Sequence, residues 1–280
     1  MNWGVRIAVI LVILGGLVWL NWERFSDESM ALVDNDLLAP VFETNTIGQA
    51  EGIPASQDTE SDQDEGDAYE EHTETEPSKL PEFVLQATPE SLNDSDTQVR
   101  SVAEEISPET GEWLKPEEQL RKWTLLVAQA AEGHTLYTNR PFTFKLVDFA
   151  LEERDERYFI SPQNFERYAA VVNVLANIPA DKLVAYYRDW YPLLDNAFSE
   201  LGLTGSFDER VDLMIERILA VKVIVLPIEL KKPTSVTYKF LDPELESASQ
   251  IDKLLWRMGP ENTRKIQDFA SRLKSALRKN

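Results

Sequence analysis

Residues 1–22 constrain this chain most, because they include a run apolar enough to lie in lipid. Every residue from 7 to 20 is apolar or glycine, and Trp3 and Trp22 flank the run. A helix over residues 3–22 is about 30 Å long, which matches the hydrocarbon core of a bilayer. The sequence therefore predicts one transmembrane anchor in residues 1–22, with the rest of the chain on one side of a membrane.

A cleaved secretory signal is the alternative to a retained anchor. Its best cleavage site, Ser29-Met30-Ala31, lies about ten residues beyond the apolar run, which is too far. The chain has no cysteine, so it has no site for a lipoprotein anchor. Arg6 precedes the run, whereas Arg24 after it is offset by Glu23, and the positive-inside tendency then favours a cytoplasmic N-terminus. We therefore expect a single-pass protein of the inner (cytoplasmic) membrane whose C-terminal domain is periplasmic, if the cell is Gram-negative.

Residues 23–79 have the composition of a disordered acidic linker. Residues 23–76 include seventeen acidic residues and one basic residue, and they are poor in large apolar side chains. Such a segment cannot bury enough apolar area to offset the entropy of ordering its backbone, and as a random coil it spans about 40 Å. This charge also opposes nucleic-acid binding, so we expect no nucleic-acid partner.

A calcium loop is one alternative for part of this linker. Four acidic residues fall at positions one, three, five and twelve of an EF-hand-like loop: Glu60, Asp62, Asp64 and Glu71. That loop needs glycine at its sixth position, whereas Gly66 is at the seventh, and no amphipathic helices flank it. The composition therefore favours a solvated spacer.

Residues 80–280 are long enough for one domain with its own core, and helical patterns dominate them. Ser95 and Gln98 have the spacing of a capping box. Pro116 suits the first position of a helix that ends at Gly133. Further helices are predicted from Ser161-Pro162 to about Asn177, from after Pro179 to Gly202, from Ser206 or Asp208 onward, and on both sides of Met258-Gly259-Pro260. Pro192 interrupts the longest pattern and should kink or split that helix.

Strand patterns are sparser than helical ones. Phe142–Leu146 and Tyr158–Ile160 are expected to pair around the charged residues 152–157, and Val236–Phe240 alternates in the same way. We therefore expect a mainly α fold, a helical C-terminal domain with a small antiparallel β element, behind one transmembrane helix and a disordered acidic linker.

Four segments of the body carry a family resemblance: ISPQNFERYAAVV, YYRDWYPLLDNAFSELG, FDERVDLMIERILA and VTYKFLDPELESAS…DKLLWRMGPEN. In this order they resemble a bacterial membrane-anchored family catalogued as domain of unknown function three-thousand-fourteen, over most of residues 80–277. The resemblance implies one N-terminal span, a variable polar spacer and a C-terminal domain. It implies no activity, ligand or catalytic residue.

Side chains for nucleophilic or metal chemistry are sparse. The two histidines are His72, in the acidic linker, and His134, which follows a predicted helix end and reads as a surface loop residue. Ser271 and Lys274 match the S-x-x-K pattern, but the companion K-T-G sequence is absent. We therefore predict no catalytic nucleophile, no cofactor and no metal site.

Paired carboxylates are the basis of an alternative function, the hydrolysis of an envelope glycan. The candidates form two groups: Glu152, Glu153, Asp155 and Glu156, and then Asp208, Glu209 and Asp212. The first group alternates with arginines, which is typical of a solvated hairpin tip. The second opens a helix, where acidic side chains favour the positive end of the dipole. Both groups therefore also have a structural explanation.

The joint around Met258-Gly259-Pro260 is the candidate interaction site. Glycine and proline account for the bend, but Arg257, Glu261 and Asn262 either cap the helix ends or meet a partner. The leading hypothesis is a non-enzymatic, membrane-anchored envelope protein whose C-terminal domain contacts an unidentified envelope protein or the cell wall. The glycan hydrolase remains the alternative.

Overall fold

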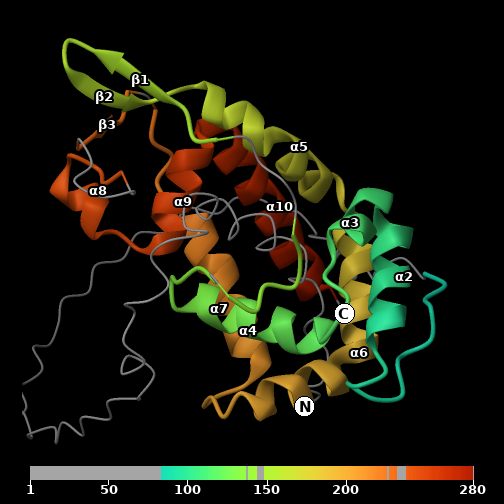
Figure 1. Cartoon of the computed structure of the whole chain (residues 1–280). Coiled ribbons are helices and arrows are strands. Elements are labelled where there is room, and N and C mark those ends of the chain that lie inside the picture. Colours follow the sequence, from blue (N-terminus) through green and yellow to red (C-terminus); the bar gives the residue numbers. More distant parts are fainter. Residues whose placement is uncertain (1–82, 137, 144–147, 226, 232–237, 280) are drawn as a thin grey trace, which may run out of the picture. The chain divides into compact units, whose positions relative to one another are not determined.

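The computed structural model describes residues 83–136, 138–143, 148–225, 227–231 and 238–279. They form a mainly helical body with a small antiparallel sheet, as the sequence predicts (Figure 1). The predicted anchor and acidic linker lie outside the described residues, so both stay predictions. Of the helices in the described ranges, none combines the length and the apolarity needed to cross a bilayer.

Three helices begin the body: α2 (Asp96–Ile106), α3 (Pro108–Trp113) and α4 (Gln119–Ala131). The capping box predicted at Ser95 is wrong, because Ser95 has helical backbone angles and its hydroxyl donates to the carbonyl of Leu92 at 2.8 Å. Helix α4 begins at Gln119 and not at Pro116. There the carboxylate of Asp96 accepts hydrogen bonds from the backbone N–H groups of Glu118 and Gln119, at 2.8 and 2.7 Å.

The next three helices, α5 (Gln163–Asn177), α6 (Ala180–Glu200) and α7 (Phe207–Ala220), match the predicted ranges closely. A full capping box, in which Ser206 and Glu209 bond each other's backbone N–H groups, starts α7. The sequence predicts that Pro192 kinks or splits α6; the helix is continuous, so it is not split there. Pro192 is exposed, while Trp190 and Leu194 on either side of it are buried, so both halves of the helix pack on the same core.

The sheet has the order β1-β2-β3, with strands β1 (Leu151–Arg154), β2 (Arg157–Ile160) and β3 (Glu229–Leu230), all antiparallel. The strand predicted at Tyr158–Ile160 is confirmed. Its hairpin partner is β1 and not Phe142–Leu146, because a tight two-residue turn at Asp155 and Glu156, with φ of 49° and 61°, closes the hairpin nearer to β2.

Two residues from the other predicted strands make single bridges. Phe142 bridges Leu114, which directly follows α3, and Phe240 bridges Leu230 at the end of β3. The sheet therefore draws its third strand from a segment after α7. Figure 1 shows the hairpin of β1 and β2 extending beyond the end of α5.

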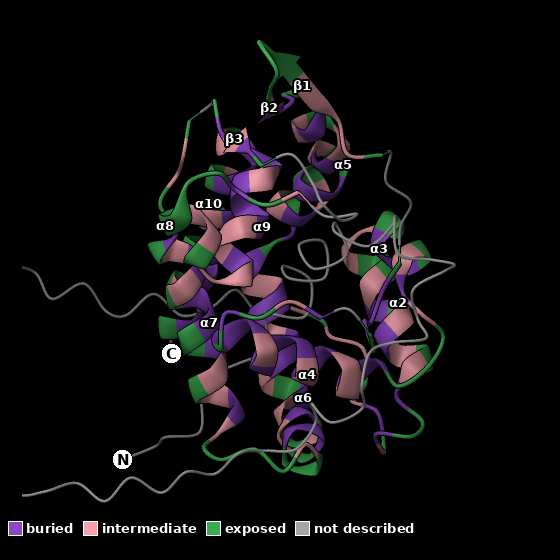
Figure 2. Ribbon diagram, turned by 60° about the vertical axis from the view of Figure 1, so that its left-hand side comes forward, coloured by how far each residue is buried: buried purple, intermediate pink, exposed green. Residues whose placement is uncertain are grey.

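The remaining helices are α8 (Pro243–Ser247), α9 (Gln250–Met258) and α10 (Pro260–Arg278). Helix α10 is central, since it packs against α5, α6, α7 and α9. Its buried face consists of Ile266, Phe269, Ala270, Leu273, Ala276 and Leu277, besides Asn262 and Thr263 in its first turn. Figure 2 shows buried residues along the inner faces of α4, α7, α9 and α10, where they contribute to one hydrophobic core.

Aromatic side chains of α6 belong to this core. Tyr186, Tyr187 and Trp190 are at most 4% exposed, and Tyr191 is partly buried against the core. The phenol of Tyr186 also holds the entry segment (residues 83–92), which leads into the body. Its hydroxyl accepts from the backbone N–H of Gln86 at 3.1 Å.

The carboxylate of Glu105 on α2 completes this attachment. It accepts hydrogen bonds from the side chain of Gln86 at 2.7 Å and from the hydroxyl of Tyr186 at 2.8 Å. Lys182 lies 2.5 Å away, and its hydrogen bond lowers the pKa of Glu105. Two residues further along, the hydroxyl of Thr88 donates to Asp189 of α6. The entry segment is thus fastened to both α2 and α6.

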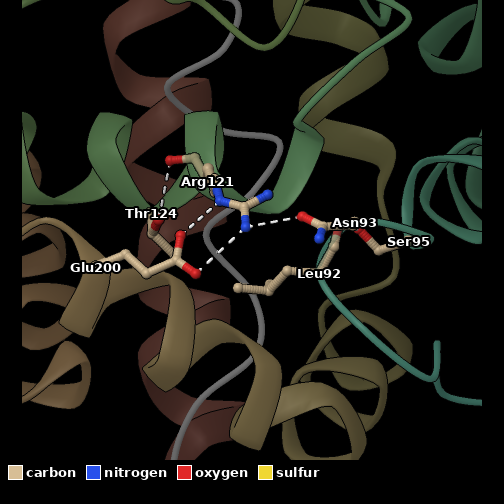
Figure 3. A network of polar contacts seen from close by, with 6 residues as sticks. All are labelled: Leu92, Asn93, Ser95, Arg121, Thr124 and Glu200. Atoms are coloured by element: carbon tan, nitrogen blue, oxygen red, sulfur yellow. Dashed lines mark hydrogen bonds and ion pairs between the residues drawn. The ribbon is translucent and has the colours of Figure 1, made fainter.

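A second network fixes the chain where it leaves the entry segment (Figure 3). Arg121 of α4 lies between Glu200, at the end of α6, and Asn93, and it donates to both. Its Nε is 2.5 Å from Glu200 Oε2, and its Nη2 is 3.0 Å from Asn93 Oδ1. One guanidinium therefore ties α4 to α6 and to the turn before α2.

Candidate interaction surface

The joint between α9 and α10 turns at Gly259, whose φ of 87° and ψ of 164° suit glycine alone. The stop and restart that the sequence predicts at Met258-Gly259-Pro260 are confirmed. A Cβ atom at residue 259 would lie 2.4 Å from the ring of Phe165 on α5. The joint is therefore a point of close approach between three helices.

Asn262 has a structural role at this joint. It is 3% exposed, and its side-chain amide donates to the carbonyls of Phe165 and Met258 at 2.8 and 2.9 Å. The next residue, Thr263, donates to the carbonyls of Leu255 and Gly259, both at 2.8 Å. The bonds to Met258 and Leu255 satisfy carbonyl groups that the end of α9 leaves without helical partners.

Glu261 and Arg257 are less buried than Asn262. The side chain of Glu261 is 80% exposed and forms an ion pair with Lys265 at 2.9 Å, which lowers the pKa of Glu261. The Arg257 guanidinium is half-buried and lies 5.1 Å from the centroid of the Phe240 ring. A role of these three residues in binding a partner stays a prediction.

A second arginine, which the sequence did not single out, lies close by on α5. The guanidinium of Arg167 is 5.1 Å from the ring centroid of Tyr168, and Tyr168 is 1% exposed. Burial raises the pKa of the Tyr168 hydroxyl, and the positive charges of Arg167 and Arg257 act against that rise. The guanidinium groups of Arg167 and Arg257 therefore both act electrostatically on the Tyr168 hydroxyl. We call Arg167, Tyr168, Phe240 and Arg257 the arginine corner.

Sequence reasoning missed Arg167 and Tyr168 because neither interrupts the amphipathic pattern of α5. An arginine beside a core tyrosine is an ordinary feature of such a helix. Their significance depends on the burial of particular nitrogen and oxygen atoms, which only the tertiary structure shows.

Three of the acidic residues proposed for a catalytic pair have structural partners. On strand β1, Glu152 forms an ion pair with Arg154 at 2.5 Å. Glu209 serves the capping box of α7, and Asp208 accepts from the buried hydroxyl of Tyr187 at 3.2 Å. The structure therefore places the two acidic groups on different elements and does not bring them together into one pair.

A surface groove of about 350 Å³ lies between α4, α7 and α9. Two acidic residues line it, but Glu216 pairs with Lys274 at 3.2 Å, and the carboxylate of Asp252 accepts a hydrogen bond from Ser249, the residue that caps α9. Lys274 is thus engaged with Glu216, while Ser271 is exposed on α10. Within the described ranges, no three His, Asp or Glu residues gather in a way that could hold a metal ion.

Comparison with known proteins identifies the family of this chain. The model of a family described as Protein of unknown function (DUF3014) matches residues 119–274, from the first residue of α4 to the last turns of α10. No curated protein and no solved structure matches the chain. The matched region contains the arginine corner and the whole sheet. Because the match covers more than half of the chain, the protein belongs to the DUF3014 family.

Proposed function

We propose that this protein is a non-enzymatic interaction module tethered to the inner (cytoplasmic) membrane. Residues 3–22 anchor it, its N-terminus is cytoplasmic, and its C-terminal domain reaches a protein or cell-wall partner in the periplasm. The apolar run with its flanking tryptophans supports the anchor, and the charge of residues 23–76 supports an extended linker.

The arginine corner is the observation that carries the interaction role. Arginine and aromatic side chains are enriched at the energetic centres of protein interfaces, because they combine a large contact area with directed hydrogen bonds. Here two arginines are each held against an aromatic ring, and both are half-buried, so they reach the surface. The neighbouring Glu261 is exposed and adds a polar rim.

No observation favours the glycan hydrolase in the same way. That reaction requires two carboxyl groups facing each other across a cleft, one of them able to hold a proton near neutral pH. Glu152, Glu209 and Asp208 instead accept hydrogen bonds that stabilise a hairpin, a helix end and a buried tyrosine.

Site-directed photocrosslinking in membranes tests the interaction role. A photoreactive residue replaces Glu261 in the full-length chain, and the control carries it at Ser271, which is exposed about 15 Å further along α10. We expect a discrete adduct from position 261 that is absent at position 271 and is lost when Arg257→Gln is added. Equal adducts from both positions, or an adduct that Arg257→Gln leaves unchanged, would contradict the proposal.

A reporter fusion tests the orientation separately. Alkaline phosphatase becomes active only outside the cytoplasm. Joined after Asn280, it should therefore be active, because the proposal places the C-terminal domain in the periplasm. An inactive fusion beside an active cytoplasmic reporter at the same position would overturn the proposed topology.

A further inference from the structure

The arginine corner contains hydrogen-bond donors that the fold does not use. Among the described residues, no acceptor lies within hydrogen-bond distance of Nε or Nη1 of Arg167, and both atoms are buried. The hydroxyl of Tyr168 is buried in the same way and has no partner there either. A buried polar atom without a partner is costly and rare, so a group of three such atoms requires an explanation.

Other arginines of the domain show what Arg167 lacks. Arg121, Arg154 and Arg157 each place Nε and Nη2 against one carboxylate. In the part of the chain that the structure describes, no carboxylate pairs with Arg167 in this way, although Arg167 is more enclosed than the exposed Arg154 and Arg157. The guanidinium of Arg167 is therefore placed as if its counter-ion were supplied by a bound molecule.

The corner also concentrates positive charge at a fixed position. Stacking on Tyr168 and Phe240 holds the two guanidinium groups, each 5.1 Å from its ring centroid. A guanidinium held in place before binding loses less side-chain entropy when its ligand arrives. Both arginines act on the Tyr168 hydroxyl, which can itself donate to an anion.

We propose that the arginine corner binds an oxyanion, the carboxylate or phosphate group of a partner molecule, through Arg167 and the Tyr168 hydroxyl. Arg257 supplies the second positive charge. Two guanidinium groups exclude a metal cation, and an oxyanion provides the acceptor oxygens that these donors need. This inference rests on the proposed interaction function and gives that function a chemical class of ligand.

Arginine side-chain NMR of the full-length protein in detergent tests the site directly. Inorganic phosphate and acetate are titrated separately, with chloride at matched ionic strength as the reference. We expect the Nε–H resonance of Arg167, assigned by its loss in Arg167→Gln, to shift saturably with phosphate, acetate or both, and not with chloride. The stronger of the two anions identifies which oxyanion the site prefers.

Variants then connect the shift to the corner. Arg257→Gln and the nearly isosteric Tyr168→Phe, followed through the Arg167 signal, should each weaken anion binding, by about tenfold for the lost charge. Arg264→Gln, which removes an exposed arginine of α10, is the matched control and should leave the affinity unchanged. Circular dichroism of each variant confirms that it is folded.

Three results would overturn the oxyanion site. They are a shift that chloride reproduces, a shift that grows linearly without saturation, and an affinity that Tyr168→Phe and Arg257→Gln leave unchanged. Failure here is distinguishable from failure of the proposed function. Saturable anion binding without a crosslink from position 261 would refute the partner role but support the oxyanion site. A crosslink from position 261 without saturable anion binding would support the partner role but refute the oxyanion site.

Discussion

At Gly259, one added methyl group should destabilise the domain strongly. The Gly259 backbone, at φ 87° and ψ 164°, lies in a region that other residues enter at a cost of about 1–3 kcal/mol. The new Cβ of Gly259→Ala would also lie 2.4, 2.5 and 2.7 Å from three atoms of the Phe165 ring. The ring must therefore move, and overpacking of this kind costs about 1–3 kcal/mol more.

We expect Gly259→Ala to lower the free energy of unfolding by about 4 kcal/mol. The measurement is urea unfolding of the full-length protein in detergent, followed by near-ultraviolet circular dichroism, which reports the packing of the aromatic core. Because a domain is stabilised by only about 5–15 kcal/mol in total, a loss of this size shifts the unfolding midpoint clearly.

Gly202→Ala provides the matched control. Gly202 also has a positive φ, of 67°, but nothing lies within 4 Å of the position that its Cβ would take. It should therefore lose about 1 kcal/mol, the backbone cost alone. Equal losses at Gly202 and Gly259 would refute the claim that the Phe165 ring limits the joint. So would a failure of Phe165→Leu to recover stability in the Gly259→Ala background.

The remaining predictions concern caps and one ion pair. Asp96→Ala should cost about 1–2 kcal/mol in urea unfolding because it leaves the first N–H groups of α4 unpaired, and Asp96→Asn, which keeps one acceptor, should cost less. Ser206→Ala should cost about 1 kcal/mol and Ser206→Thr clearly less; equal losses would show that the capping box does not stabilise α7. The pKa of Glu105 is lowered in the folded state, so its contribution to stability is present above its unfolded pKa and is lost as the pH falls through its folded pKa. Thermal unfolding between pH 6 and about pH 3 should therefore show a smaller acid loss in Glu105→Gln than in the unchanged protein, and parallel curves would contradict this assignment.

The fold was predictable from sequence wherever helix signals are local. Ser206 with Glu209, and Gly259 with Pro260, mark the ends of helices through bonds and torsions within a few residues. Ser95 with Gln98 has equivalent spacing but forms no capping box. The hydroxyl of Ser95 donates to the carbonyl of Leu92 instead, and the neighbouring Asp96 serves the start of α4.

The hairpin shows a different limit. Its turn residues, Asp155 and Glu156, adopt positive φ without any glycine or asparagine, so the sequence lacks the usual signal for a tight turn. The strand at Tyr158–Ile160 was recognisable from its composition, whereas the partner depended on where the turn closed. Similarly, Pro192 reads as a helix breaker, and only burial on both sides of it explains why α6 continues.

The candidate site was half predictable. A polar joint at Arg257, Glu261 and Asn262 is visible in the sequence, because glycine and proline mark the bend. The unused donors of Arg167 and Tyr168 are not visible there, since they depend on which atoms α9 and its neighbours cover. Of the arginine corner, the sequence therefore located Arg257, and the three-dimensional structure added Arg167, Tyr168 and Phe240.

The attachment of the entry segment has a mechanical consequence for a tethered protein. Any pull on the chain from its N-terminal side enters the domain at residue 83 and meets the bonds of Gln86 and Thr88 first. The acceptors of these bonds belong to two helices: Glu105 to α2, and Tyr186 and Asp189 to α6. The two helices therefore share the force before either one is pulled away from the domain. In the proposed tethered protein, load from the N-terminal side thus falls on α2 and α6, whereas Arg167 and Arg257 lie on α5 and α9.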